Sequence, residues 1–525
     1  MHALAERRAP AFAASGSRFE ALVSYLHGEE AMGMRHSDLE RELVARGREL
    51  LCTMLQEHLD LRRSAQAQEP VRAADGTPRS RQRLQERDLE TVVGTVTVTR
   101  VGYGAKGAAS LHPLDAALNL PPQRYSHELE RRVAQDAAKS SFAETVCSLE
   151  NQTGDALPKR QVEQIARRAA ADFDTFYAQR PVEAAAASTG SLLVTTLDGK
   201  GVVMRREDLR APTRQAAERR VHKLSRRLSK GEKRNAKRMA TVAAVYTVAP
   251  VVRTPEDIVR GLTGIGPADE PAPAQGARPR PEHKRVWASV EQEPAQVIEE
   301  AFREADRRDP CRARTWLALV DGNATQLRLL HEISTRQGVV VTIVLDIVHV
   351  AQYLWAAALA FHAEGSPARE VWVAERLAEI LRGRASLVAA AMRRSATRRG
   401  LTRPQRTAVD KCAGYLLRYK AYLRYDAYLA AGFPIATGVI EGACRHVVKD
   451  RMDLTGARWS LAGAEAVLRL RALRASGDFE EYWRFHEDQE FQRHHVARYA
   501  NGEVPAVKKP MRGRSGRRPH LHSVK

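Results

Sequence analysis

Residues 315–349 decide the fold of this chain and read TWLALVDGNATQLRLLHEISTRQGVVVTIVLDIVH. Two apolar runs, 316–320 and 339–345, are each followed by an aspartate, Asp321 and Asp346. Their density of Val, Ile and Leu predicts strands that are buried on both faces. The residues between them have the length and spacing of a helix that begins after Asp-Gly-Asn, a turn and capping sequence. The stretch therefore predicts a strand–helix–strand unit with acids at the carboxyl ends of its strands, where open α/β sheets bind ligands.

Length and charge set bounds on the rest of the chain. Its 525 residues predict about two to four domains. Lys and Arg number 84 against 63 Asp and Glu, a net charge of +21, which favours a polyanionic partner such as nucleic acid. The sequence lacks an apolar run near the ~20 residues of a spanning helix and lacks a signal-peptide pattern, so we expect a cytoplasmic protein of the bacterial nucleoid without a membrane partner. The five scattered cysteines, without a CxxC pair, indicate a reducing compartment and argue against a zinc module.

The part of the chain before residue 186 predicts a mostly helical DNA-binding region. Residues 1–90 have charged, helical patterns typical of a solvated hairpin or a dimerisation arm, and residues 91–103 alternate in β fashion around Gly94. Residues 141–173, SFAETVCSLENQTGDALPKRQVEQIARRAAADF, predict a helix-turn-helix whose second helix is basic, although a purely structural helix pair is the alternative. The candidate DNA-binding side chains are Lys159, Arg160, Gln164, Arg167 and Arg168.

A third apolar run, residues 191–198 (SLLVTTLD), ends in Asp198. The Gly-Lys-Gly and Val-Val-Met that follow predict a hairpin that continues into a second strand. Residues 241–248 are also β-like, and the basic segment between these two runs is either a solvated face or a phosphate contact through Lys233 and Arg234.

The pattern becomes helical after His349 and stays helical to residue 434. Thr437 is then placed to cap a further helix that carries Glu441 in its first turn. Arg445, one turn later, could bind a phosphate or pair with Glu441.

The predicted order of strands and helices matches an RNase H-like layout, in which carboxylates of the first strand, the fourth strand and a late helix converge. Carboxylates in such a cluster repel one another and need a cation, and hard oxygen ligands of this kind hold Mg²⁺ well. Two such ions would activate a water or a 3′-hydroxyl and stabilise the leaving oxygen of a phosphodiester. Taken singly, an aspartate before glycine is more often an ordinary turn residue.

At this point the sequence resembles the DDE transposases of bacterial insertion sequences, and most of all their Kra-type group, which is related to the Mutator and hAT branch. The resemblance covers about residues 90–475. It implies Asp198, Asp321 and Glu441 as a catalytic triad that binds two Mg²⁺ or Mn²⁺ ions. It also implies accessory roles for Asp346, His349, Arg458 and Trp459. The motifs that carry it are Leu197-Asp198-Gly199, Val320-Asp321-Gly322-Asn323, Asp346-Ile347-Val348-His349, Val439-Ile440-Glu441-Gly442 and Arg458-Trp459.

The resemblance implies a transposase that binds the terminal inverted repeats of an element, cleaves its ends and transfers them to double-stranded target DNA as a dimer or larger homo-oligomer. Two alternatives remain: an RNase H-like nuclease or resolvase without strand transfer, and a catalytically inactive DNA-binding protein derived from a transposase. The expected divisions are a helical N-terminal region (1–90), a small β element with the helix-turn-helix (91–185), the first part of the catalytic core (186–349), a helical insertion (350–434), completion of the core (435–475), and a C-terminal helix with a basic tail (476–525).

Overall fold

The chain is a mixed α/β protein that divides into two compact units. The computed structural model describes residues 11–63, 65–180, 190–219, 236–265, 280–454 and 456–508. We call residues 1–177 with 480–525 the terminal unit, and residues 178–479 the central unit. Within the described ranges, the helices are all too short or too polar to cross a membrane.

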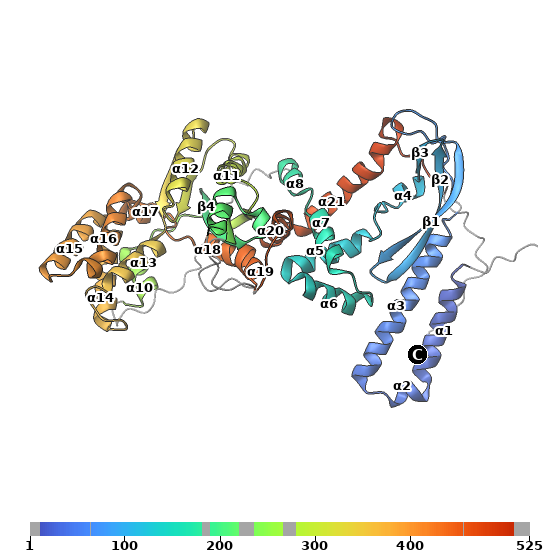
Figure 1. Cartoon of the computed structure of the whole chain (residues 1–525), viewed down its shortest axis with the longest axis horizontal. Coiled ribbons are helices and arrows are strands. Elements are labelled where there is room, and N and C mark those ends of the chain that lie inside the picture. Colours follow the sequence, from blue (N-terminus) through green and yellow to red (C-terminus); the bar gives the residue numbers. More distant parts are fainter. Residues whose placement is uncertain are drawn as a thin grey trace, which may run out of the picture. The chain divides into compact units, whose positions relative to one another are not determined.

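The terminal unit begins with a helical hairpin, as the sequence predicted. Helices α1 (Ala13–His27) and α3 (His36–Asp60) are antiparallel and are joined through the short α2 (Glu29–Gly33) (Figure 1, blue). Near the end of α3, the Glu57 carboxylate accepts hydrogen bonds from the backbone N–H groups of Ala14 (2.8 Å) and Ser15 (3.1 Å). This contact satisfies two free donors in the first turn of α1 and fixes the pairing of the two helices.

A three-stranded antiparallel sheet follows, with β1 (Arg81–Thr91), β2 (Gly94–Ala105) and β3 (Ala108–Leu111) in that order. The sequence predicted strands only from residue 91 onward, and this boundary was wrong, because β1 begins at Arg81. The β1 sequence, RQRLQERDLET, is mostly polar because most of its side chains are exposed, so its apolar alternation is too weak to identify a strand.

The predicted helix-turn-helix is present as two helices packed on a third. Ser141 and Glu144 form a capping box at the start of the first helix, and Gly154 (φ 83°) ends it in the left-handed conformation. Buried leucine, valine and isoleucine side chains form the shared core. The helices of this region are α4 (Pro113–Ala117), α5 (His127–Lys139), α6 (Phe142–Thr153), α7 (Lys159–Ala169), α8 (Phe173–Gln179) and, from the end of the chain, α21 (Phe479–His494).

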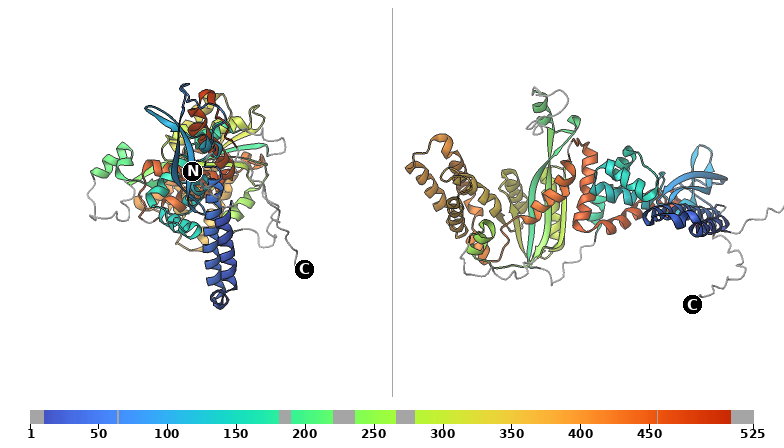
Figure 2. Two further views of the ribbon diagram at one scale, coloured as in Figure 1. Left: turned by 90° about the vertical axis from the view of Figure 1, so that its right-hand side faces the viewer. Right: turned by 90° about the horizontal axis from the view of Figure 1, so that it is seen from below.

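The central unit is built on a five-stranded mixed sheet with the strand order β6-β5-β4-β7-β8. The first three strands in this order are antiparallel, and β4, β7 and β8 are parallel (Figure 2, right-hand view, green). The predicted strand–helix–strand unit is confirmed as β7, α12 and β8. The bounds are β4 (Leu192–Val203), β5 (Lys237–Val248), β6 (Glu282–Ser289), β7 (Thr315–Val320), α12 (Ala324–Gln337) and β8 (Val341–Leu345).

The hairpin predicted after Asp198 is absent, because β4 continues straight through this point. Gly199 pairs with Thr241, and Gly201 pairs with Met239, so β5 accompanies β4 along its whole length. A continuous partner strand keeps the two glycines extended where the sequence alone favoured a turn. Lys233 and Arg234 lie outside the described residues. Helix α9 (Ala211–Glu218) precedes β5 along the chain, and helix α10 (Pro255–Thr263) follows it.

The helical block predicted after His349 is confirmed, and residues 350–432 contain helices and turns without a strand. The pattern at residues 405–431 predicted one long helix, but the structure breaks it near Tyr419 into two. In Figure 1 this block, α13 to α17, lies at one end of the central unit. The helices are α13 (Ile347–Ala358), α14 (Pro367–Leu381), α15 (Ala385–Arg398), α16 (Arg403–Arg418), α17 (Tyr425–Ala430), α18 (Gly438–Ala443), a π-helical turn (Cys444–Lys449), α19 (Asp450–Met452) and α20 (Leu461–Ser476).

A buried ion cluster fastens α11 (Pro294–Arg308) to the sheet. Glu304 accepts hydrogen bonds from Arg285 of β6 (2.8 Å) and from Arg308 (2.7 Å). Burial opposes ionisation of this carboxyl, but the positive charges of Arg285, Arg308 and Arg307 outweigh it and lower the pKa of Glu304 to about 2.

We expect Glu304→Gln to lower the free energy of unfolding by about 3–5 kcal/mol, because it removes the carboxylate partner of the buried Arg308 and leaves the buried Arg285 with Glu300 alone. Since the folded pKa of Glu304 lies below its ordinary value of 4.5, its contribution is complete above about pH 4.5 and is lost as pH falls toward 2. Denaturant unfolding between pH 7 and 3 measures both effects. Glu299→Gln, on the same helix in an exposed pair with Arg336, is the control and should change stability by less than about 0.5 kcal/mol.

Candidate functional site

Two of the three predicted catalytic carboxylates are level with each other on neighbouring parallel strands. The pairing of β4 with β7 is in register up to Thr196 and Leu319. Two residues further along each strand lie Asp198 and Asp321. Neighbouring strands are ~4.8 Å apart, so continuation of the register brings these two aspartates to the same edge of the sheet.

A third aspartate extends this row. Val320 pairs with Leu345, and the next residues along β7 and β8 are Asp321 and Asp346. The Asp346 backbone N–H donates to the Val320 carbonyl at 2.9 Å, which continues the register past the end of β8. Asp198, Asp321 and Asp346 therefore form one row across β4, β7 and β8. We call these three residues the aspartate row.

Asp198 is held from two sides. One of its carboxylate oxygens accepts a hydrogen bond from the Gly199 N–H at 2.6 Å, and the other accepts from the Cys444 thiol at 3.1 Å. Burial and the negative charge of Asp198 raise the pKa of the Cys444 thiol far above its ordinary value, so the thiol keeps its proton and acts as the donor. Cys444 lies directly after α18, and its thiol forms a hydrogen bond between this region and β4.

Glu441 lies in the first turn of α18 with its side chain open to solvent. Partial burial raises the pKa of its carboxyl, and the negative charges of Asp346 and Asp198 raise it further, whereas His349 opposes them. Glu441 therefore lies within electrostatic reach of two members of the aspartate row and of the predicted accessory histidine. The structure brings together Asp198, Asp346, Glu441 and His349.

Asp321 opens onto a pocket of about 650 Å³ between the end of β7 and the helices α13 and α16. Its carboxylate accepts from the Asn323 N–H at 2.9 Å, and its backbone carbonyl accepts from the Tyr415 hydroxyl at 3.1 Å. Between them, Gly322 adopts a φ of 94°, a conformation that side chains other than glycine rarely allow. The pocket is lined by Asp321, Gly322, Asn323, His349, Tyr353, Asp410, Lys411, Gly414, Tyr415, Arg418 and Tyr419.

Asp346 is almost fully buried and joins the two ends of the helical block. Its carboxylate accepts from the Thr437 hydroxyl (2.7 Å), the Thr437 N–H (3.3 Å) and the Val348 N–H (3.1 Å). Thr437 was predicted to cap the helix of Glu441 with its side chain, and this was wrong in detail. The Thr437 hydroxyl donates to Asp346 instead. Asp346 thus positions the start of α18, a role that a contact over 91 residues hides from the sequence.

Trp459 packs against the end of β4. Its backbone N–H donates to the Val203 carbonyl at 3.0 Å, its indole N–H donates to the Met452 carbonyl at 3.2 Å, and the Arg451 guanidinium lies 4.7 Å from its ring. The neighbouring Arg458 is exposed. Arg445 is also exposed and points toward Asp450, at 3.9 Å, instead of pairing with Glu441.

The second helix of the helix-turn-helix presents a basic face to solvent. Lys159, Arg160 and Arg167 are exposed and Gln164 is half-buried, while the opposite face of α7 is buried in the core. Arg168 is different, because it forms an ion pair with the buried Glu130 of α5. Of the five candidate side chains on α7, three are therefore exposed, Gln164 is half-buried, and Arg168 stabilises the helix packing.

The terminal unit also contains a buried cluster that was not predicted from the sequence. In the described part of the chain, only one set of three His, Cys, Asp or Glu side chains has potential metal-ligand atoms that all lie within 4.8 Å of one another. It consists of Asp172, His486 and Glu490. Arg493 pairs with both carboxylates and supplies their counter-charge. Asp198, Asp321 and Glu441 are less tightly grouped than this set.

The donor set around the aspartate row nevertheless fits Mg²⁺ or Mn²⁺. It consists of carboxylate oxygens, which these hard cations prefer. Burial is the largest cause of the raised pKa of Glu441, and the negative charges of Asp346 and Asp198 add to it; a bound cation would relieve that added repulsion. The sequence matches no protein-family model and none of the curated proteins with which it was compared.

Proposed function

We propose that this chain is a DNA transposase that cleaves the ends of a mobile element and joins them to target DNA, using divalent ions held by Asp198, Asp321 and Glu441. The observation that carries the proposal is the level placement of Asp198 and Asp321 on adjacent parallel strands, with Glu441 within electrostatic reach of Asp198 and Asp346. The strand order β6-β5-β4-β7-β8 fits an RNase H-like sheet, and the helical block before Glu441 fits the transposases that the sequence resembles.

The residues of the site have separate tasks in this proposal. Two divalent ions would activate the attacking oxygen and stabilise the leaving oxygen of the phosphodiester. Asp198 and Asp321 hold their carboxylates at a rigid sheet edge, where Gly199, Cys444 and Asn323 orient them. Glu441 contributes from a helix that Asp346 fixes. Lys411 and Arg418, at the pocket beside Asp321, place positive charge where the DNA backbone would pass.

DNA binding is assigned to α7 in the terminal unit. Its exposed basic residues suit phosphate and base contacts in a major groove, and the overall charge of +21 favours a polyanion. In this proposal the terminal unit recognises the inverted repeats, and the central unit performs the chemistry.

Replacing Arg160 and Arg167 by alanine should weaken binding to the inverted repeats about a hundredfold, because two exposed cations on the recognition helix are lost. The slope of log K against log salt should fall by about 2. Fluorescence anisotropy with labelled repeat DNA measures both quantities. The matched control is Arg35→Ala with Arg41→Ala on the N-terminal hairpin, which removes the same charge from another surface. Equal losses for the two double variants would contradict specific recognition by α7.

The reaction products distinguish the proposal from its alternatives. A transposase leaves element ends covalently joined to target DNA, whereas a nuclease or resolvase leaves cleaved ends alone. A non-catalytic DNA-binding protein would bind the repeats and leave them intact.

A further inference from the structure

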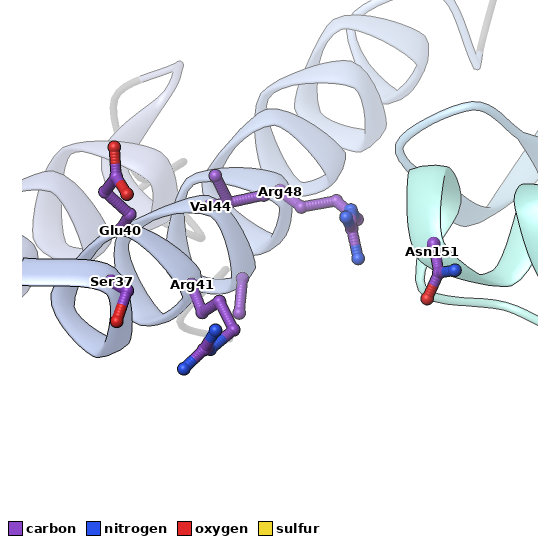
Figure 3. A pocket seen from close by; sticks show the side chains of 7 residues that line it. Ser37, Glu40, Arg41, Val44, Arg48 and Asn151 are labelled. Atoms are coloured by element: carbon purple, nitrogen blue, oxygen red, sulfur yellow. The ribbon is translucent and has the colours of Figure 1, made fainter.

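The N-terminal hairpin has one face that nothing else in the described part of the terminal unit covers. Three sides of helix α3 face other elements of the terminal unit. Glu42 and Arg46 lie toward α1, and Cys52 and Gln56 contact β2. Arg48 lies toward α6. Figure 3 shows this last side, where Arg41 and Arg48 of α3 and Asn151 of α6 border a pocket of about 350 Å³, and where Val44 lies at the boundary with the remaining side. The remaining side of α3 is apolar and exposed.

We call the exposed apolar surface of this hairpin the hairpin face. Along α3 its residues recur every seven positions, as Val44-Leu51-His58 and Gly47-Met54-Leu61, which is the spacing of a helix-packing seam. The hairpin face consists of Phe12, Gly16, Phe19 and Val23 from the α1 segment, and Leu43, Val44, Gly47, Leu51, Met54, His58 and Leu61 from the α3 segment.

The exposed apolar residues form one stripe along α1 and another along α3, and both stripes lie on the same side of the hairpin. In each helix the apolar stripe lies roughly a third of a turn, in the same rotational sense, from the side that contacts the other helix. Because α1 and α3 are antiparallel, equal rotations bring both stripes to one surface. The contacts Arg18–Glu49 and Ala14–Glu57 establish this antiparallel arrangement.

The hairpin has almost no buried core of its own. Ser15 is the only buried residue of α1, and Leu59 is the only one of α3. By contrast, the eight large apolar side chains of the hairpin face are each 38–58% exposed. Together they expose on the order of 600 Å², which is at the upper end of the apolar patches of monomeric proteins and close to the ~800 Å² per partner of a standard interface.

From this surface we infer that the hairpin face binds the same face of a second copy of the chain, so that two hairpins form a four-helix bundle. The residues of the face include no Lys or Arg, and the line of Gly47, Met54 and Leu61 leads back to the exposed acid Glu40, so the face is poorly suited to a DNA phosphate. Two antiparallel helices with apolar stripes on one side are half of such a bundle, and a two-fold axis makes the surface self-complementary. The end segments 1–10 and 509–525 are basic and poor in large apolar residues, which suits them badly to cover it.

Sedimentation equilibrium of the full chain without DNA tests this inference, and it is independent of the proposed catalytic activity. We expect a concentration-dependent dimer. Leu51→Glu on α3 and Phe19→Glu on α1 should each weaken it about a hundredfold or more, because a carboxylate would be buried without a partner. Leu51→Ala, which only removes apolar area, should weaken it about tenfold.

Leu387→Glu is the matched control, because Leu387 is a comparably exposed leucine (65%) on α15 of the central unit. It should leave the dimer unchanged. Circular dichroism checks that each variant keeps its helix content, and Leu51→Ala keeps the test decisive if a glutamate variant fails to fold. A chain that stays monomeric at tens of micromolar would overturn the inference. It would equally fail if Leu51→Ala and both glutamate variants dimerise like the unchanged protein.

Discussion

Glu441→Gln is expected to lower the rate of end cleavage in Mg²⁺ about a thousandfold or more, while affinity for the inverted repeats stays within about twofold. The substitution keeps the size of the side chain and removes the charge that a divalent ion requires. Binding to the repeats is assigned to the separate terminal unit, so it should survive. Gel-based cleavage assays and anisotropy on the same preparations measure the two quantities. Asp198→Asn and Asp321→Asn should behave alike.

Asp453→Asn is the control for this experiment. Asp453 is an exposed acid beyond the π-helical turn after Glu441, close enough in sequence to be the competing candidate for the third carboxylate. Its loss should leave cleavage unchanged. If Glu441→Gln cleaved at the normal rate, or if Asp453→Asn abolished cleavage, the third ligand would be misassigned and the transposase proposal would lose its main support.

The second large effect concerns Asp346. Asp346→Ala leaves the Thr437 hydroxyl and the N–H groups of Thr437 and Val348 without an acceptor in a buried position. We expect the free energy of unfolding to fall by about 3–5 kcal/mol. Cleavage should fall as well, because Glu441 is carried by the helix that begins after Thr437. Chemical denaturation and cleavage assays at a temperature where the variant is folded separate the two effects.

Two substitutions of the partner residue show whether Asp346 acts by positioning. Thr437→Val removes the hydroxyl and should reproduce part of both defects, whereas Thr437→Ser keeps the donor and should be close to the unchanged protein. If Asp346→Ala abolished cleavage without lowering stability, and Thr437→Val had no effect, Asp346 would act directly on the DNA or on a metal ion.

The sequence was informative where local pattern and fold agree. The runs around Asp321 and Asp346 are apolar because their strands lie inside a parallel sheet, and Asn323 caps the intervening helix with its side chain. The helix-turn-helix was equally predictable from the sequence, because the Ser141 capping box and Gly154 mark the two ends of its first helix. These features depend on neighbours within a few residues.

The parts that the sequence could not give depend on distant partners. β1 is polar because one side of its sheet is open to solvent, and β4 stays extended at Gly199 because β5 pairs with it throughout. The link between Asp346 and Thr437 spans the whole helical block, and the contact of Cys444 with Asp198 spans 246 residues. Arg168 was predicted to contact DNA, but in the structure it forms an ion pair with the buried Glu130.

A strand-transfer assay tests directly whether this chain is a DNA transposase. Linear DNA that ends in the element's inverted repeats is incubated with the full chain, a circular target plasmid and Mg²⁺, and joined molecules are detected by sequencing across the junctions. If the chain is a transposase, we expect covalent junctions between repeat ends and target DNA that disappear with EDTA and with Asp321→Asn. The transposase proposal would be contradicted if repeat DNA were bound but never joined, or if Asp321→Asn gave the same junctions as the unchanged protein.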